Sequence, residues 1–346
     1  MTDSELTKSI ISARADADFL TNDMQDEAET ALDVELRRVH VPFENHGSRL
    51  DKTLAALVPE FSRSYLQQLL EAGGVLVKGH KCLKASAKVK AGDELSIELR
   101  PTPQSQAFKP EVMALDVVYE DDHLLVINKP AGLVVHPAPG NWSGTLLNGL
   151  LAHDDRASFM PRAGIVHRLD KDTSGLMVVA RQRQIMDQLV GMIAARTVSR
   201  EYIAVGHGAW DGAKTRRVEA PIGRDSRNRL RMAVVDLDKH AGKVASTVVS
   251  LLDSTEPYCL VKCKLHTGRT HQIRVHMAYL GHPLVSDEVY GGVRAGKLER
   301  QALHAWRLAF DHPATGEQME FISPLPPDIL GALASFGLRY NELLKS

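Results

Sequence analysis

The sequence predicts an α+β protein with one small and one large domain. Its 346 residues are enough for two such domains, and its hydrophobic fraction of 44% is ordinary for a globular protein. A polar stretch at residues 101–110, beginning Pro101-Thr102-Pro103, has little to pack and is typical of a linker. On both sides of it, short β-branched runs and amphipathic helical patterns occur together.

The first 40 residues predict an acidic, disordered arm. Residues 1–36 carry ten Asp and Glu but only Lys8 and Arg14 as basic residues, and few large apolar side chains. Such a segment buries too little surface to offset the entropy of ordering. We expect the first folded domain to begin at residue 41.

We expect residues 41–100 to form the small domain. Leu50, Leu54 and Leu57 have helical spacing, and Pro59 ends that helix. A second helix starts at Ser62-Arg63-Ser64 and ends at Gly73-Gly74. Strands are expected at residues 75–77 and 94–99.

We expect residues 111–346 to form the large domain. Most of its apolar runs are short and rich in β-branched residues, as strands are, and three segments have helical patterns or a helix start. Strands are expected at residues 115–119, 124–127, 165–166, 176–180, 199–205, 258–265, 305–310 and 319–322. Helices are expected at residues 183–195, from Thr270 as the capping residue to Leu280, and from Pro327 onward.

The stretch from Gly164 to Ala180 places charged residues on a turn between two expected strands. Arg168 and Asp170 are two residues apart, so in an extended chain they point to the same side. A guanidinium beside a carboxylate keeps it ionised even when partly desolvated. From these residues alone, a solvated turn without catalytic function remains the alternative.

His167-Arg168-Leu169-Asp170-Lys171-Asp172-Thr173-Ser174-Gly175-Leu176 resembles the signature of the RluA-type family of RNA pseudouridine synthases. Three further segments resemble the family's motifs and follow its order: Asn128-Lys129-Pro130, Arg200-Glu201-Tyr202, and Thr267-Gly268-Arg269-Thr270-His271-Gln272-Ile273-Arg274. The resemblance implies a catalytic domain built on a mixed, largely antiparallel sheet with flanking helices. It also implies isomerisation of uridine to pseudouridine without a cofactor.

The resemblance assigns roles within these motifs. It implies that Asp170 is the essential catalytic residue, Tyr202 stacks on the target base, and Arg274 pairs with Asp170. Whether Asp170 attacks as a nucleophile or removes a ribose proton stays open. Arg168 would fill the space that the flipped base leaves. Arg269 and His271 are expected to bind substrate.

Residues 41–100 resemble the αL RNA-binding module. The matching segments are Arg49-Leu50-Asp51 and the stretch from Ser62 to Gly79. The resemblance implies that four basic residues face RNA phosphates: Arg49, Arg63, Lys78 and Lys81. The alternative is a small surface domain with ordinary solvated lysines.

Charge and composition are consistent with an RNA substrate. Residues 162–231 contain 14 Lys and Arg against 7 Asp and Glu, although the whole chain has a net charge of −1. Within the family, the resemblance is to enzymes that modify the helix-69 stem-loop of 23S rRNA, so the expected partner is 23S rRNA or the large-subunit precursor. We expect a cytoplasmic monomer without membrane contact, because neither a signal-peptide pattern nor a bilayer-length apolar run occurs.

Three alternative functions fit the sequence less well. Asp170-Lys171-Asp172-Thr173 fits the DxDxT loop of a phosphotransferase, but no downstream acidic Mg²⁺ motif follows. A non-catalytic ribosome-assembly factor would not need the set of candidate catalytic residues. Zinc binding at Cys259 and Cys263 near His266 lacks a fourth ligand at finger-like spacing, so we expect buried thiols and no metal.

Overall fold

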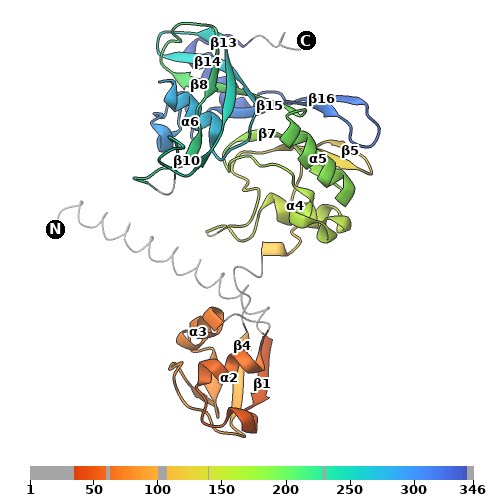
Figure 1. Ribbon diagram of the computed structural model, residues 1–346, viewed down its shortest axis with the longest axis vertical. Helices are drawn as coiled ribbons and strands as arrows, with labels where there is room; N and C mark the ends of the chain where they lie inside the picture. The colour runs from red at the N-terminus through yellow and green to blue at the C-terminus, as the bar shows by residue number, and fades with distance from the viewer. Residues whose placement is uncertain (1–34, 60–62, 100–106, 139, 229–230, 341–346) are drawn as a thin grey trace, which may run out of the picture. The chain divides into compact units, whose positions relative to one another are not determined.

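The computed structural model describes residues 35–59, 63–99, 107–138, 140–228 and 231–340 (Figure 1). The chain forms two compact units that divide between Gln106 and Ala107. Most of the expected acidic arm lies outside the described residues. Its last six residues form strand β1 (Glu35–His40), which pairs antiparallel with β4 (Glu94–Leu99). The small domain therefore begins before residue 41, because backbone pairing along β4 orders residues whose composition alone indicated disorder.

The small domain packs two helices on a four-stranded sheet. The helices are α2 (Leu50–Leu57) and α3 (Arg63–Glu71), and the strand order is β1-β4-β2-β3. Strand β2 spans Val75–Val77 and β3 spans His80–Lys81. Leu50, Leu54 and Leu66 are fully buried between helices and sheet. The expected helices and the strands at 75–77 and 94–99 are confirmed.

The large domain is built on a nine-stranded sheet. Its order is β5-β6-β7-β15-β8-β14-β13-β9, with β16 pairing β15. Among the described strand pairs, only β7 and β15 run parallel, so the sheet is mixed and largely antiparallel, as expected. The strands are β5 (Val117–Glu120), β6 (Leu124–Lys129), β7 (Ser174–Ala180), β8 (Ser199–His207), β9 (Thr215–Glu219), β13 (Ser246–Ser254), β14 (Tyr258–Leu265), β15 (Leu303–Asp311) and β16 (Gln318–Ile322). A separate small sheet contains β10 (Ile222–Arg224), β11 (Met232–Val234) and β12 (Gly242–Lys243).

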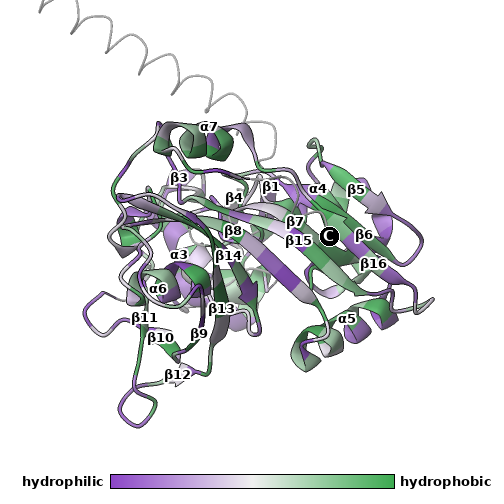
Figure 2. Cartoon of the chain, turned by 90° about the horizontal axis from the view of Figure 1, so that it is seen from above, coloured by the Kyte–Doolittle hydropathy of each residue, from purple (hydrophilic) through white to green (hydrophobic). Residues whose placement is uncertain are grey.

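Helices cover both faces of the large sheet. They are α4 (Leu146–His153), α5 (Arg183–Ala195), α6 (Gln272–Tyr279) and α7 (Pro327–Phe336). Alternate residues of β7 point to opposite faces: Leu176 and Val178 share a cluster with α5, whereas Met177 and Val179 share one with α4 and α6. Figure 2 shows hydrophobic residues along the middle of this sheet. In the described part of the chain, no helix is long and apolar enough to cross a bilayer.

Gly175, the second residue of β7, lies directly against β15. Its φ is +115°, and a Cβ atom there would lie 2.2 Å from the backbone oxygen of Ala305. The parallel pairing of β7 with β15 therefore requires glycine at this position. This pairing holds β7 in place, and β7 begins directly after residues 170–173.

Three local expectations were wrong. Residues 107–110 belong to the large unit rather than to a linker, and Asn148 Nδ2 donates to the carbonyl of Lys109 at 2.8 Å. Ile165 forms only an isolated bridge with Val179 instead of a strand. Thr270 does not cap α6; the Gln272 side chain accepts the Arg269 N–H at 3.0 Å, so a residue inside the helix satisfies the preceding turn.

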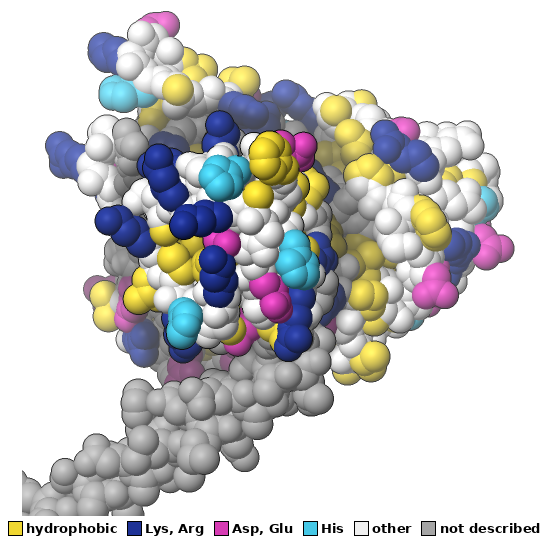
Figure 3. Space-filling model, turned by 90° about the horizontal axis from the view of Figure 1, so that it is seen from below, with side chains coloured by type: hydrophobic (Ala, Val, Ile, Leu, Met, Phe, Trp, Pro, Cys, Tyr) yellow, Lys and Arg dark blue, Asp and Glu magenta, His cyan; other side chains and the backbone are white. Residues whose placement is uncertain are grey.

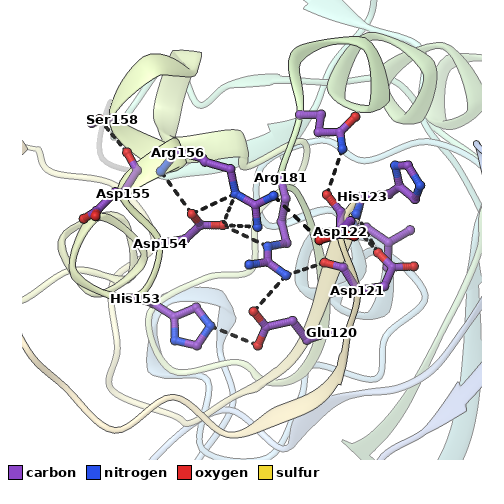
Figure 4. A network of polar contacts seen from close by, with 12 residues as sticks. Glu120, Asp121, Asp122, His123, His153, Asp154, Asp155, Arg156, Ser158 and Arg181 are labelled. Carbon is purple, nitrogen blue, oxygen red and sulfur yellow. Dashed lines mark hydrogen bonds and ion pairs between the residues drawn. The ribbon is translucent and has the colours of Figure 1, made fainter.

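A polar network joins the β5–β6 turn to the end of α4 (Figure 4). Arg181 lies at its centre and pairs with Glu120 at 2.9 Å and with Asp154 at 2.8 Å. Its guanidinium also donates to the carbonyl of Asp121. Arg156 adds a second ion pair to Asp154, at 3.0 Å. The network holds together segments that are far apart in the sequence.

Candidate active site

A pocket of about 580 Å³ in the large domain brings together residues from distant motifs. Its walls come from the loop before β7, from β8, and from residues 265–274. All six predicted catalytic and substrate-binding residues line it: Arg168, Asp170, Tyr202, Arg269, His271 and Arg274. The pocket is about the size of a small-molecule site, large enough for a nucleoside.

Asp170 presents a partly exposed carboxylate to this pocket. One oxygen accepts a hydrogen bond from Arg274 Nη1 at 3.2 Å, and the other lies 3.8 Å from His271 Nε2. The side chain is 16% exposed. Arg274 therefore holds one oxygen of Asp170, and the carboxyl group lines the pocket.

Arg274 is shared between two carboxylates. Its Nε and Nη2 atoms donate to Asp287 at 2.7 and 2.8 Å, and Asp287 is only 1% exposed. Burial opposes the charged guanidinium, but Asp287 and then Asp170 outweigh it and raise the pKa of Arg274. The guanidinium also lies 4.9 Å from the centre of the Tyr290 ring. Asp287 therefore holds the Arg274 guanidinium in place while its Nη1 atom donates to Asp170.

His271 has a left-handed backbone conformation, with φ +56°, directly before α6. Its Nδ1 atom forms a 2.8 Å hydrogen bond with the Tyr290 hydroxyl. Burial, opposed by Asp170, lowers the pKa of His271. The unusual backbone places the imidazole beside the carboxylate of Asp170.

Tyr202 lies on the pocket face of β8. Its ring is buried, and burial followed by the charge of Asp170 raises the pKa of its hydroxyl, with Arg200 opposing. The phenol is thus neutral at physiological pH. A flat aromatic ring beside the carboxylate can stack on a base.

Lys129 is a buried residue that holds the loop containing Asp170. Its ammonium donates to the carbonyls of Pro130, Leu133 and Lys171 at 2.8 to 2.9 Å, and the residue is 1% exposed. Burial lowers the pKa of Lys129 to about 8, against the attraction of Asp172 and Asp170. The bond to the carbonyl of Lys171, the residue after Asp170, fixes the backbone next to Asp170.

Comparisons with known proteins agree with this geometry. Residues 123–279 match the model of the RNA pseudouridylate synthase family, and residues 48–95 match the S4 domain. The chain is 50% identical over 307 residues to ribosomal large subunit pseudouridine synthase D of Neisseria meningitidis serogroup B, covering 85% of this chain and 80% of that protein. The chain belongs to the RluA-type family of RNA pseudouridine synthases.

Two further proteins place this pseudouridine synthase among its relatives. Ribosomal large subunit pseudouridine synthase D of Pseudomonas aeruginosa is 46% identical over 311 residues, covering 86% of this chain and 95% of that protein. The structure of human RNA pseudouridylate synthase domain containing 1 superposes with a TM-score of 0.51 at 28% identity. It covers 63% of this chain and 87% of the human chain. Family membership sets aside the phosphotransferase interpretation of Asp170-Lys171-Asp172-Thr173.

The S4 domain of this pseudouridine synthase carries the other predicted RNA-binding residues. Arg49 forms an ion pair with Asp51 at 2.9 Å, and Lys78 forms one with Asp93 at 2.8 Å. Lys81 is exposed on β3. The side chain of Arg63 lies outside the described residues. Figure 3 shows Lys, Arg and His side chains spread over the near face, with Asp and Glu side chains among them.

Several residues at the active site of this pseudouridine synthase were missed as site residues from the sequence. Asp287 and Tyr290 fix Arg274 and His271, but the sequence between Val285 and Gly291 has no recognisable catalytic pattern. Lys129 belongs to the Asn128-Lys129-Pro130 motif, but no role for its side chain was evident from the sequence. Cys259 and Cys263, by contrast, are buried in β14 as expected, and burial raises the pKa of Cys259 to about 11.

Proposed function

We propose that this pseudouridine synthase isomerises uridines in 23S rRNA of the large ribosomal subunit or its precursor, in the helix-69 stem-loop. The observation that carries the proposal is the Asp170 carboxylate, paired with Arg274 in a nucleoside-sized pocket that Tyr202 also lines. The names of relatives with 46 to 50% identity support large-subunit RNA as the substrate. We further propose that the enzyme acts in the cytoplasm as a monomer.

In the proposed reaction, the bond from ribose to N1 of uracil breaks, the ring rotates, and a bond from ribose to C5 forms. Asp170 starts the reaction either as a nucleophile or by removing a ribose proton. Arg274 contacts Asp170 at 3.2 Å and orients its carboxyl group for either route. Tyr202 stacks on the uracil and helps to remove the C5 proton, while N1 gains a proton, so that the product is an isomer of uridine. Arg168, exposed at the pocket rim, fills the space that the flipped base leaves.

Mapping of carbodiimide-modified rRNA tests this proposal. Cells lacking the gene are complemented with the wild type, with Asp170→Asn, or with Asp187→Asn as a control. Asp187 is an exposed aspartate that pairs with Arg183 on α5 and does not line the pocket. We expect pseudouridines in the helix-69 stem-loop with the wild type and the control, and none with Asp170→Asn.

The same maps separate two ways of being wrong. Pseudouridine formed only in other RNAs would contradict the proposed substrate but leave the catalytic assignment intact. Full modification by a folded Asp170→Asn variant would contradict the role of Asp170. A filter-binding measurement with the variant then shows whether RNA binding is retained, as we expect.

A further inference from the structure

Unpaired buried polar atoms concentrate at the active-site pocket. Within the described ranges, five buried side-chain nitrogen or oxygen atoms lack a hydrogen-bond partner. Three of them belong to residues that line the pocket: His136 Nε2, His167 Nδ1 and Arg200 Nε. Because folded proteins pair nearly all buried polar groups, such exceptions at one pocket indicate partners supplied by a ligand.

Arg200 is the charged member of this group. It precedes Tyr202 by two residues on β8, so both side chains lie on the pocket face of the sheet. The residue is only 6% exposed. The neighbouring carboxylate, Glu201, cannot neutralise it, because Glu201 pairs with Arg307 at 3.1 Å and Lys262 at 3.5 Å. No acceptor in the described part of the chain bonds the Nε atom of Arg200.

The opposite wall leaves room for this guanidinium. A Cβ atom at Gly268 would lie 2.9 Å from Arg200 Nη1, so a side chain there would displace the guanidinium from its present position. Glycine at this position therefore lets the guanidinium lie against the backbone of the loop that leads to Arg274. Arg200 and Gly268 belong to two separate motifs of the chain, Arg200-Glu201-Tyr202 and Thr267-Gly268-Arg269.

The missing partner should be an anion. An unpaired buried charge costs several kcal/mol, which a neutral carbonyl offsets only in part. The surroundings add positive charge: burial and then Arg217, Lys264 and Arg196 lower the pKa of His266, which lines the same pocket. In RNA the available anion is the phosphodiester, whose oxygens match the planar fork of a guanidinium.

We propose that Arg200 binds a backbone phosphate of the RNA, at the target uridine or the nucleotide beside it. Arg200 would thus anchor the RNA backbone while Asp170 and Tyr202 act on the nucleoside. This inference rests on the proposed function only in placing RNA in the pocket. It does not depend on which RNA is the natural substrate.

Arg200→Met tests the proposal, with Arg183→Met as the matched control. Arg183 is an exposed arginine on α5 that pairs with Asp187 and does not line the pocket. Affinity is measured against salt concentration on a 23S rRNA fragment and on poly(U). Phosphates of the fragment are also ethylated at random, and the positions that block binding are mapped for each protein.

We expect Arg200→Met to weaken binding roughly 10- to 100-fold and to reduce the salt slope by about 0.7–0.9. Ethylation interference at one phosphate beside the target uridine should disappear in this variant only. Its melting temperature should be unchanged or higher, because an unpaired buried charge has been removed. A wild-type salt slope and interference pattern would overturn the proposal. Poly(U) binding gives this readout even if 23S rRNA proves not to be the substrate.

Discussion

Arg274 directs its two shortest side-chain hydrogen bonds, at 2.7 and 2.8 Å, to Asp287. The bond to the catalytic candidate Asp170 is longer, at 3.2 Å, and uses the remaining nitrogen. The two-pronged pair fixes the plane of the guanidinium before substrate binds. The single positive charge of Arg274 is thus shared between Asp287 and Asp170. Asp287 is therefore a positioning residue for the active site.

Asp287→Asn should reduce kcat by roughly 10- to 100-fold, the range typical of losing a group that orients a reacting residue. The KM should change little, because Asp287 does not line the pocket. Steady-state kinetics on an rRNA fragment measure both parameters. Glu288→Gln is the control, since Glu288 is an exposed neighbour paired with Arg294. A larger KM with unchanged kcat would contradict the positioning role.

Arg274→Ala should impair catalysis far more than Arg269→Ala. Removing one partner of a buried ion pair costs roughly 3–5 kcal/mol, and Arg274 serves two such pairs. Arg269 is only half-buried at the pocket rim and donates to the carbonyl of Val244 at 3.1 Å. Single-turnover rates compare the variants, and melting curves separate reduced activity from reduced stability. Equal reductions of activity in two stably folded variants would reject the assignment of Arg274.

The parts of the site that the sequence predicted lie within contiguous motifs. Asp170, Tyr202 and Arg274 come from three segments, and each was placed by the residues immediately around it. Asp287 could not be found in this way, because its role depends on folding the loop after α6 back onto Arg274. Arg200 could not be identified from the sequence either. Its neighbour Glu201 forms ion pairs with Arg307 and Lys262 on adjacent strands, and these contacts become visible only in the fold.

The fold was predictable where local patterns and packing agree. Helix α5 spans residues 183–195, as its apolar spacing indicated. Strand β1 was missed because its acidic surroundings indicate disorder, whereas its order comes from pairing with β4, a strand distant in the sequence. Thr270 satisfied the local rule for a helix cap, but the amide of Gln272 reaches the preceding turn instead.

The S4 domain should contribute a salt-sensitive part of RNA affinity. In the triple variant Arg49→Gln, Lys78→Gln and Lys81→Gln, log affinity should fall less steeply with log salt, by about 0.7–0.9 for each phosphate that is no longer neutralised. The kcat at saturating RNA should change little, because the pocket lies in the other unit. Filter binding at several salt concentrations measures the slope. An unchanged slope would mean that these residues do not bind phosphates, and the ion pairs of Arg49 and Lys78 with Asp51 and Asp93 would then be their main role.

Asp154 should make the large domain sensitive to acid. Burial opposes its charge, but hydrogen bonds from Arg156 and Arg181 outweigh burial and lower its pKa from 3.8 to about 2. A depressed carboxyl pKa stabilises the fold above about pH 4, by about 2 kcal/mol, and this stability is lost as pH falls through about 2. Asp154→Asn should therefore lower the free energy of unfolding in urea at pH 7, and its difference from wild type should shrink between about pH 4 and pH 2. Asp155→Asn, an exposed neighbour, is the control. A difference independent of pH would show that the ionised Asp154 is not what stabilises the network.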